Sequence, residues 1–157
     1  MIEFGDWIRQ TALAVWVGES AIGFPLALIL HAVGMAFVAG FHFSMDARLL
    51  GFAPSIRPAA FNKLLPFVWL NVVLIAVSGV MLLTAFPARV LTNSVFYLKM
   101  LLLVFALLLT QPLRRACGGE HGTSTFRIKL LASLSIVLWV SIIVAGRLLA
   151  YTHNRFI

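Results

Sequence analysis

Residues 21–45 read AIGFPLALILHAVGMAFVAGFHFSM, a run without a single Asp, Glu, Lys or Arg. A helix that crosses the hydrocarbon core of a bilayer needs about 20 predominantly apolar residues. Ser20, just before the run, is a favoured N-cap residue, and Pro25 is tolerated close to a helix start. We therefore predict that this stretch is a membrane-spanning helix.

Three more apolar runs of similar length follow, at about 62–86, 94–111 and 126–151, with Pro112 expected to stop the third. The whole chain has 157 residues, of which 62% are hydrophobic and only 11% charged, whereas about a quarter of the residues of a soluble domain are charged. The mean hydropathy is +1.03. These features predict an all-α integral membrane four-helix bundle, folded as a single transmembrane domain over residues 1–157.

The segment before the first span has a different pattern. In residues 2–18, apolar side chains recur at helical spacing and polar ones fill the other side. We predict an amphipathic interfacial helix that lies on the outer membrane surface, with Trp7 and Trp16 at headgroup level. Docking of the same helix onto a partner subunit is the alternative.

Basic residues are concentrated in two links, the one between the first and second spans and the one between the third and fourth. They are Arg48, Arg57, Lys63, Arg114, Arg115, Arg127 and Lys129. Excess Lys and Arg marks the cytoplasmic side of a membrane protein. We therefore expect a multi-pass protein of the bacterial inner (cytoplasmic) membrane with both termini on the outer, periplasmic side. The net charge of +7 is explained by topology and lipid contact, so nucleic acid is not an expected partner.

Polar side chains within the spans are costly and each needs a reason. Five stand out: His31, His42, Asn71, Lys99 and Arg147. His31 lies about 15 Å into the first span, near the middle of the membrane. His42 comes eleven residues later, about 16 Å deeper and only about 20° around the helix. The two histidines share a face but not a level, so one macrocycle cannot use both as axial ligands.

Lys99 and Arg147 are expected at a common outer level, one to two turns above His31. No carboxylate is available within the predicted spans to neutralise them, since Asp46 lies at the inner rim. Two unmatched cations favour an anionic ligand, and a haem satisfies the pattern. His31 would ligate the haem iron, Lys99 and Arg147 would bind the propionates, and Gly34 would let a flat macrocycle approach the helix.

Several alternatives stay open at this stage. His31 can instead hydrogen-bond a neighbouring helix through Asn71, and Lys99 and Arg147 can each reach lipid phosphates. His42 is either a hydrated structural histidine near the inner interface or a cofactor-binding residue for a second group. The second axial ligand is not identified. The iron is either five-coordinate, or its sixth ligand is Lys99 as a neutral amine or a residue from another chain. No catalytic residue is assigned.

The first-span pattern LHAVGMAFVAGFHFSMDARLLG resembles that of small bacterial four-helix membrane proteins of uncharacterised function. The resemblance extends to SGVMLL, YLKMLLL and AGRLLAY in the later spans. A more distant likeness is to the HemJ-type protoporphyrinogen oxidase and the membrane domain of the copper-resistance protein CopD. In the HemJ type, a histidine of the first span and a lysine at the start of an LKLLL-like span are the functional pair. His31 and Lys99 match those positions, and the resemblance implies haem b here too.

Three functions follow as hypotheses. The first is a haem b protein in electron transfer within or beside a membrane redox complex, with quinone or another macrocycle as further possible cofactors. The second is a non-catalytic, structural or pigment-binding subunit of a larger membrane assembly, or a homo-oligomer. The third is an enzyme, a HemJ-like oxidase, which the lack of a carboxylate within the spans disfavours. Copper import ranks below these because no His, Met and Cys cluster converges from several spans.

Overall fold

A computed structural model describes residues 7–52, 54–118 and 126–152, and this part of the chain holds helices and no strand. Four helices are long: α3 (Gly23–Leu50), α4 (Pro58–Ala85), α6 (Ser94–Gly118) and α7 (Phe126–Tyr151). Two are short: α2 (Ala12–Glu19) and α5 (Pro87–Leu91). The long helices form the four-helix bundle that the hydropathy pattern predicts, so the predicted fold class is confirmed.

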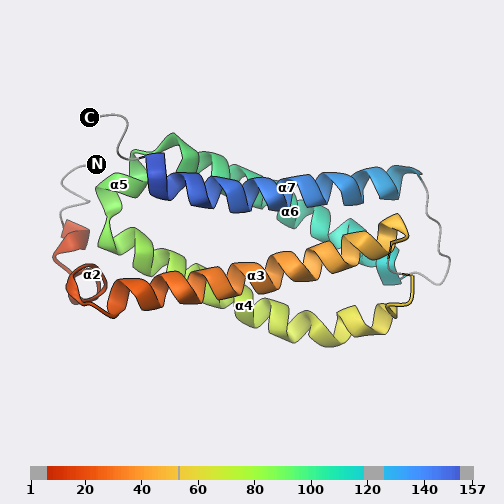
Figure 1. Ribbon diagram of the computed structural model, residues 1–157, viewed down its shortest axis with the longest axis horizontal. Coiled ribbons are helices and arrows are strands. Elements are labelled where there is room, and N and C mark those ends of the chain that lie inside the picture. Colours follow the sequence, from red (N-terminus) through yellow and green to blue (C-terminus); the bar gives the residue numbers. More distant parts are fainter. Residues whose placement is uncertain (1–6, 53, 119–125, 153–157) are drawn as a thin grey trace.

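The long helices pair along the bundle, α3 against α4 and α6 against α7, and α3 also packs against α7 and α6 (Figure 1). At one end of the bundle lie α2, α5 and the last turn of α7; we call this the terminal end. At the other end α3 ends and α7 begins; we call this the loop end.

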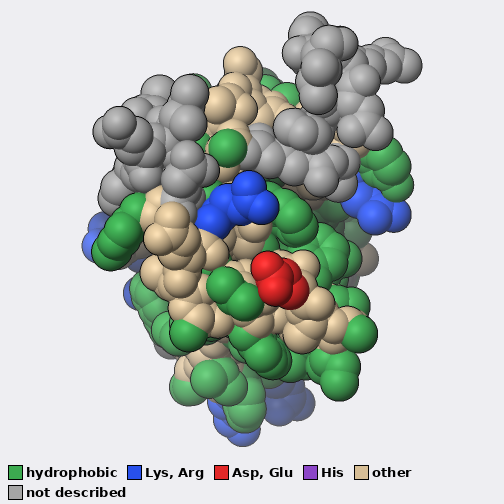
Figure 2. All heavy atoms as spheres, turned by 90° about the vertical axis from the view of Figure 1, so that its left-hand side faces the viewer, with side chains coloured by type: hydrophobic (Ala, Val, Ile, Leu, Met, Phe, Trp, Pro, Cys, Tyr) green, Lys and Arg blue, Asp and Glu red, His purple; other side chains and the backbone are tan. Residues whose placement is uncertain are grey.

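All four long helices are long and apolar enough to cross a membrane. Their flanks carry many exposed Leu, Val, Ile and Phe side chains. Figure 2 looks at the terminal end and shows acidic and basic side chains on that end, with hydrophobic side chains along the flanks. An apolar flank between polar ends is typical of a helical bundle in lipid, and the chain is a multi-pass membrane protein.

Two helix ends that involve a proline differ from the predicted ones. α6 runs through Pro112 to Gly118, so the prediction that Pro112 stops the third span is wrong. Proline removes one backbone hydrogen bond, but helices in a membrane tolerate it where neighbouring groups satisfy the freed carbonyl. α4 begins at Pro58 rather than near residue 62, because proline is favoured at the first position of a helix.

The first span is also longer than predicted at its C-terminal end. α3 continues to Leu50 and is closed by Gly51, which has φ 93° and whose N–H reaches the carbonyls of Ala47 and Arg48. A left-handed glycine is a common way to end a helix. As a consequence, Asp46 lies inside α3, one turn before its end.

The predicted interfacial helix is divided. Residues 2–6 lie outside the described residues, and residues 7–9 are helical. The chain then turns at Thr11, which has extended backbone angles and caps α2 by accepting a hydrogen bond from the Ala14 N–H at 3.3 Å. α2 packs against α3 and α4 through its buried Val17, while Trp16 stays exposed. The amphipathic segment thus covers the terminal end of the bundle, and its position at the membrane surface stays a prediction.

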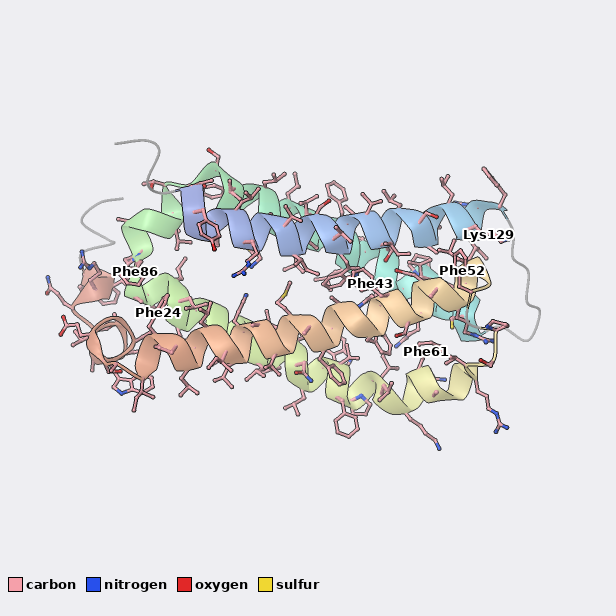
Figure 3. The ribbon with its side chains drawn as sticks, in the orientation of Figure 1. Phe24, Phe43, Phe52, Phe61, Phe86 and Lys129 are labelled. Atoms are coloured by element: carbon pink, nitrogen blue, oxygen red, sulfur yellow. The ribbon has the colours of Figure 1, made fainter. Side chains whose placement is uncertain are left out.

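Aromatic pairs pack at both ends of the bundle (Figure 3). Phe24 of α3 meets Phe86, the residue between α4 and α5, at the terminal end, with ring centroids 5.7 Å apart. Phe41 of α3 meets Phe61 of α4 in the same edge-to-face manner, also at 5.7 Å, nearer the loop end. Edge-to-face pairs of this kind add about 0.5–1.5 kcal/mol beyond the area that they bury. They join α3 to α4 near the loop end and to the residue that follows α4 at the terminal end.

Candidate functional site

His31 lies between α3, α4 and α6, in what we call the His31 site: His31, Ser78 and Lys99. Its Nδ1 is 3.1 Å from Ser78 Oγ on α4. The Ser78 hydroxyl has one hydrogen, which it donates to the Leu74 carbonyl at 2.6 Å. Ser78 Oγ therefore accepts from His31, so the proton of a neutral ring is on Nδ1. The lone pair of His31 Nε2 is left facing away from α4.

Lys99 of α6 occupies the space in front of that lone pair. Its Nζ is 3.5 Å from His31 Nε2, a long and weak hydrogen bond in which the amine donates. Both side chains are partly buried. The structure thus brings together the histidine and the lysine that the sequence singled out, although they are 68 residues apart in the chain.

Glycines on two helices face this pair. A Cβ at Gly79 of α4 would lie 3.4 Å from His31 Cε1, and a Cβ at Gly146 of α7 would lie 3.6 Å from Lys99 Nζ. Arg147 follows Gly146 directly and has an exposed side chain. Lys99 thus lies next to the turn of α7 that carries Arg147, and the Arg147 side chain is exposed.

Gly34 and Asn71 have roles other than the expected ones. A Cβ at Gly34 would lie 2.7 Å from Ile75 Cγ1 and 3.3 Å from the Asn71 carbonyl oxygen. Gly34 thus lets α3 and α4 approach closely, which accounts for the glycine without a macrocycle. Asn71 donates to the Phe67 carbonyl of its own helix at 2.8 Å, and the partner of His31 on α4 is Ser78 instead.

His42 lies in a second polar group, which we call the His42 cluster: His42, Asp46, Thr110, Ser135 and Trp139. Its side chain is 2% exposed, so the interpretation as a hydrated histidine is wrong. Nδ1 donates to the Val38 carbonyl at 2.8 Å, and Nε2 is 3.0 Å from Thr110 Oγ1 on α6. The ring packs on Trp139 of α7, with centroids 4.5 Å apart. Because both ring nitrogens are engaged, we do not place His42 in a haem site.

Asp46 completes the cluster one turn further along α3. Its side chain is fully buried, and neither carboxylate oxygen has a hydrogen-bond partner within the described residues. Ser135 Oγ and Trp139 Nε1 of α7 are likewise buried without a partner there. The expectation that the spans hold no carboxylate is therefore wrong: a carboxyl group lies inside the bundle, beside Ser135 of α7.

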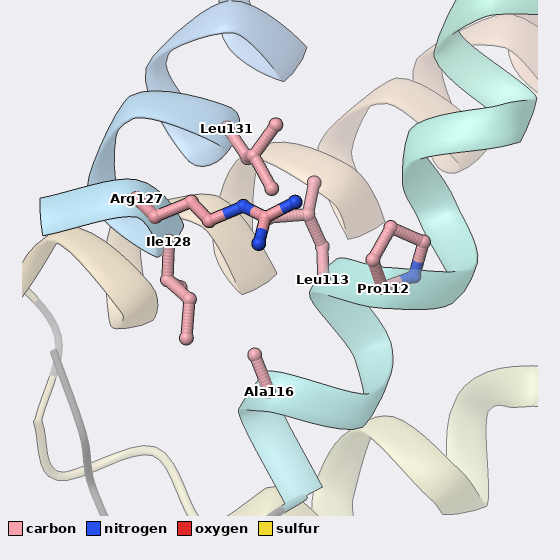
Figure 4. A pocket seen from close by; sticks show the side chains of 6 residues that line it. All are labelled: Pro112, Leu113, Ala116, Arg127, Ile128 and Leu131. Atoms are coloured by element: carbon pink, nitrogen blue, oxygen red, sulfur yellow. The ribbon is translucent and has the colours of Figure 1, made fainter. Parts of the chain in front are cut away.

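Two shallow pockets lie along α6, and neither is lined by a histidine. The first has a volume of about 400 Å³ and lies between α6 and α7 near the loop end (Figure 4). Its lining is Pro112, Leu113, Ala116, Arg127, Ile128 and Leu131. Arg127 is the single charged side chain among these six, and no second polar group accompanies it. These surfaces carry no recognisable chemistry, so the histidine groups are the candidate sites.

Sequence reasoning missed Ser78, Thr110 and Trp139, and it placed Asp46 outside the spans. Ser78 donates to its own helix, as serines in membrane helices commonly do, and it also accepts from His31. The sequence did contain one signal for these residues. His42 and Asp46 are four residues apart, and so are Ser135 and Trp139, so each pair lies on one face of its helix.

The described residues include no group of three or more His, Cys, Asp and Glu side chains arranged to hold a metal ion. A porphyrin needs only one or two axial ligands from the protein, so this finding leaves the haem hypothesis untested.

Comparison with known proteins gives a family but no activity. No curated protein and no solved structure matches the chain. A family model described as "Family of unknown function (DUF6644)" matches residues 4–152. This match spans nearly the whole sequence, and the chain belongs to the DUF6644 family.

Proposed function

We propose that the protein binds haem b at His31 and transfers electrons within or beside a redox complex of the bacterial inner membrane. One observation carries the proposal: the Ser78 hydroxyl holds the proton of a neutral His31 on Nδ1 and leaves the Nε2 lone pair unprotonated. A histidine that ligates a metal almost always donates its other ring N–H to a nearby acceptor, which fixes the tautomer and the ring orientation. Ser78 plays that part here.

The residues around His31 fit a haem in their chemistry. Nε2 is matched only by a 3.5 Å contact with Lys99 Nζ, which is weak enough to be replaced. Gly79 and Gly146 present no side chain toward the pair. Lys99 and Arg147 supply the cations that two propionates need, since Arg and Lys form the strongest hydrogen bonds with carboxylates.

In this proposal each side chain has one task. His31 would ligate the iron, Ser78 would orient the ring, and Lys99 and Arg147 would bind the propionates at the terminal end. The apolar side chains around them exclude water. A bound haem would supply a one-electron couple. Gly34 and His42 are not part of this site, because the first packs against α4 and the second is saturated.

The proposed orientation places the His31 site nearer the periplasm. Seven basic residues lie in or near the links at the loop end, namely Arg48, Arg57, Lys63, Arg114, Arg115, Arg127 and Lys129. By the positive-inside rule this end faces the cytoplasm. The terminal end, with α2 and α5, then faces outward. Electrons would reach the haem from a partner at the outer half of the membrane.

The absorption spectrum of the purified protein, oxidised and dithionite-reduced, tests the haem. We expect a b-type spectrum in the wild type and its loss in His31→Ala. His42→Gln is the matched control, because it removes the other intramembrane histidine, and it should keep the spectrum. A colourless, fully inserted wild type after expression with a haem precursor overturns the proposal, and so does equal haem content in both variants.

A second pair of variants distinguishes propionate binding by Lys99 from ligation of the iron by its amine. Lys99→Met is compared with Lys129→Met, an exposed lysine at the loop end. If Lys99 binds a propionate, its loss lowers haem retention while the spectral type stays the same. A change of the spin state in Lys99→Met identifies the amine as an axial ligand instead. No difference from Lys129→Met removes Lys99 from the site.

An enzyme of the protoporphyrinogen-oxidising type is the second candidate, and the His31–Lys99 contact is the observation that favours it. The buried Asp46 also removes the argument that the spans hold no carboxylate. Growth rescue of a bacterial strain lacking protoporphyrinogen oxidation tests this activity. Good expression in the membrane without rescue excludes it and leaves the electron-transfer function.

A further inference from the structure

Asp46 is the least expected group in the molecule. It is fully buried, both carboxylate oxygens lack a hydrogen-bond partner within the described residues, and it faces α7. An ionised carboxylate without a partner in an apolar interior costs several kcal/mol. The low-energy forms are a neutral carboxylic acid or a carboxylate balanced by a nearby cation. His42, one turn back along the same helix, is the group that can become that cation.

The hydrogen bonds of His42 accommodate two protonation states. Nδ1 faces the Val38 carbonyl, which can only accept, so Nδ1 carries a hydrogen in every state. Nε2 faces Thr110 Oγ1 at 3.0 Å, and the same oxygen is 3.0 Å from the Ala106 carbonyl. When the Thr110 hydroxyl donates to Nε2, the ring is neutral. When it donates to the Ala106 carbonyl, Nε2 must carry a proton and donate to Thr110.

The two states interconvert by rotation of one hydroxyl, so protonation of His42 requires no movement of heavy atoms. The ring stays packed on Trp139 in both. Ser135 Oγ of α7 lies beside the Asp46 carboxyl and has no hydrogen-bond partner within the described residues. The Ser135 hydroxyl is a hydrogen-bond donor that can turn toward the carboxylate when the proton is on His42.

Other charged and titratable groups also lie near Asp46. On α3, Arg48 donates to the carbonyls of Pro54 and Ile56, at the start of the link to α4. On α6, the buried Cys117 thiol faces both Asp46 and Arg48. Lys63 of α4 and Arg127 of α7 are exposed at the same end. Asp46 lies four residues from the end of α3, about 6 Å along the axis, so solvent is close.

We propose that His42 and Asp46 form a proton-binding site that holds one proton and exchanges it with the aqueous phase at the loop end. In one form Asp46 is a carboxylic acid and His42 is neutral. In the other the O–H bond of Asp46 is broken, an N–H bond forms at His42 Nε2, and the pair is zwitterionic. Net charge is the same in both. Neither form depends on a haem at His31, so this site stands whether or not the electron-transfer function is correct.

Infrared spectroscopy of the full-length protein in nanodiscs tests the proposal, combined with nitrogen-15 NMR of labelled histidine side chains. At neutral pH we expect a C=O stretch of a protonated carboxylic acid that shifts in D₂O, together with a fraction of His42 doubly protonated. Asp46→Asn should abolish the band. Glu19→Gln, which alters an exposed acid, should leave it unchanged. Both signals should vary together as the pH is changed.

His42→Gln supplies an independent readout and keeps the test valid if Asp46→Asn fails to insert. With no second proton acceptor, the acid band of Asp46 should become stronger than in the wild type. Three results overturn the proposal. They are no acid band in either protein, an equal band in both with His42 neutral throughout the titration, and a band that does not exchange in D₂O or respond to pH.

Discussion

α3 presents two histidines on one face, and their surroundings are opposite in kind. His31 is partly buried, has one ring nitrogen fixed by Ser78, and directs the other at a loosely held lysine. His42 is buried, has both nitrogens satisfied, and packs on a tryptophan. In our proposals the first binds a ligand, and the second shares a proton with Asp46. Residue type and helix face are the same, so the neighbouring helices make the difference.

Among substitutions that test this comparison, Trp139→Ala should cause the largest loss of stability. This side chain is 1% exposed and packs on His42, so Trp139→Ala should lower the free energy of unfolding by about 3–5 kcal/mol, the usual cost of such a cavity. Trp69→Ala is the matched control, because Trp69 is 66% exposed on α4. Unfolding in mixed micelles measures both. Equal losses in the two variants would show that the His42 cluster does not stabilise the bundle.

A smaller effect is expected where α3 and α4 meet. A Cβ at Gly34 would lie 2.7 Å from Ile75 Cγ1, whereas a Cβ at Gly40 has no heavy atom within 4 Å. Gly34→Ala should therefore cost about 1–3 kcal/mol through overpacking. Gly40→Ala should stabilise the helix by about 0.5–1 kcal/mol. A harmless Gly34→Ala would leave the glycine free for another role, including contact with a ligand.

The fold could be predicted from the sequence because a membrane span must satisfy its own backbone hydrogen bonds, which makes length and hydropathy sufficient. The fourth helix, Phe126–Tyr151, has the predicted bounds. The errors are at Pro58, Pro112 and Gly51, where local backbone chemistry rather than hydropathy sets the helix end. They matter because the extra turn of α3 carries Asp46 into the bundle.

The candidate site was predictable in part. Lys99 and His31 were placed at neighbouring levels by counting residues along two helices, and the structure puts their nitrogens 3.5 Å apart. Ser78, Thr110 and Trp139 could not be assigned, because helices that are apolar all round give no signal of their rotation about the axis. Without that rotation, a serine that bonds its own helix cannot be told from one that also faces a histidine.

Ser78→Ala tests whether Ser78 orients His31 or only bonds its own helix. It removes the acceptor of His31 Nδ1, and the usual net contribution of such a hydrogen bond is about 1 kcal/mol. Ser141→Ala removes only a hydroxyl that donates to its own helix at 2.7 Å, and it should cost less. If His31 ligates haem, Ser78→Ala should also weaken haem binding about 10- to 100-fold. Identical behaviour of the two variants would remove Ser78 as an orienting residue.

Arg147→Gln is expected to have the smallest effect on the fold and is informative for that reason. Its side chain is exposed, and substitutions at exposed positions usually change stability by no more than about 0.5 kcal/mol. If Arg147 contacts only lipid phosphates, Arg147→Gln should have no effect on haem binding. If Arg147 binds a propionate, Arg147→Gln removes a charge-assisted hydrogen bond worth about 1.5–3 kcal/mol. Haem retention should then be weaker while the stability of the fold is unchanged. Arg127→Gln at the loop end is the control. If haem titration gives the same affinity for both variants, the argument from unmatched cations fails, and His31 with Ser78 must hold the cofactor alone.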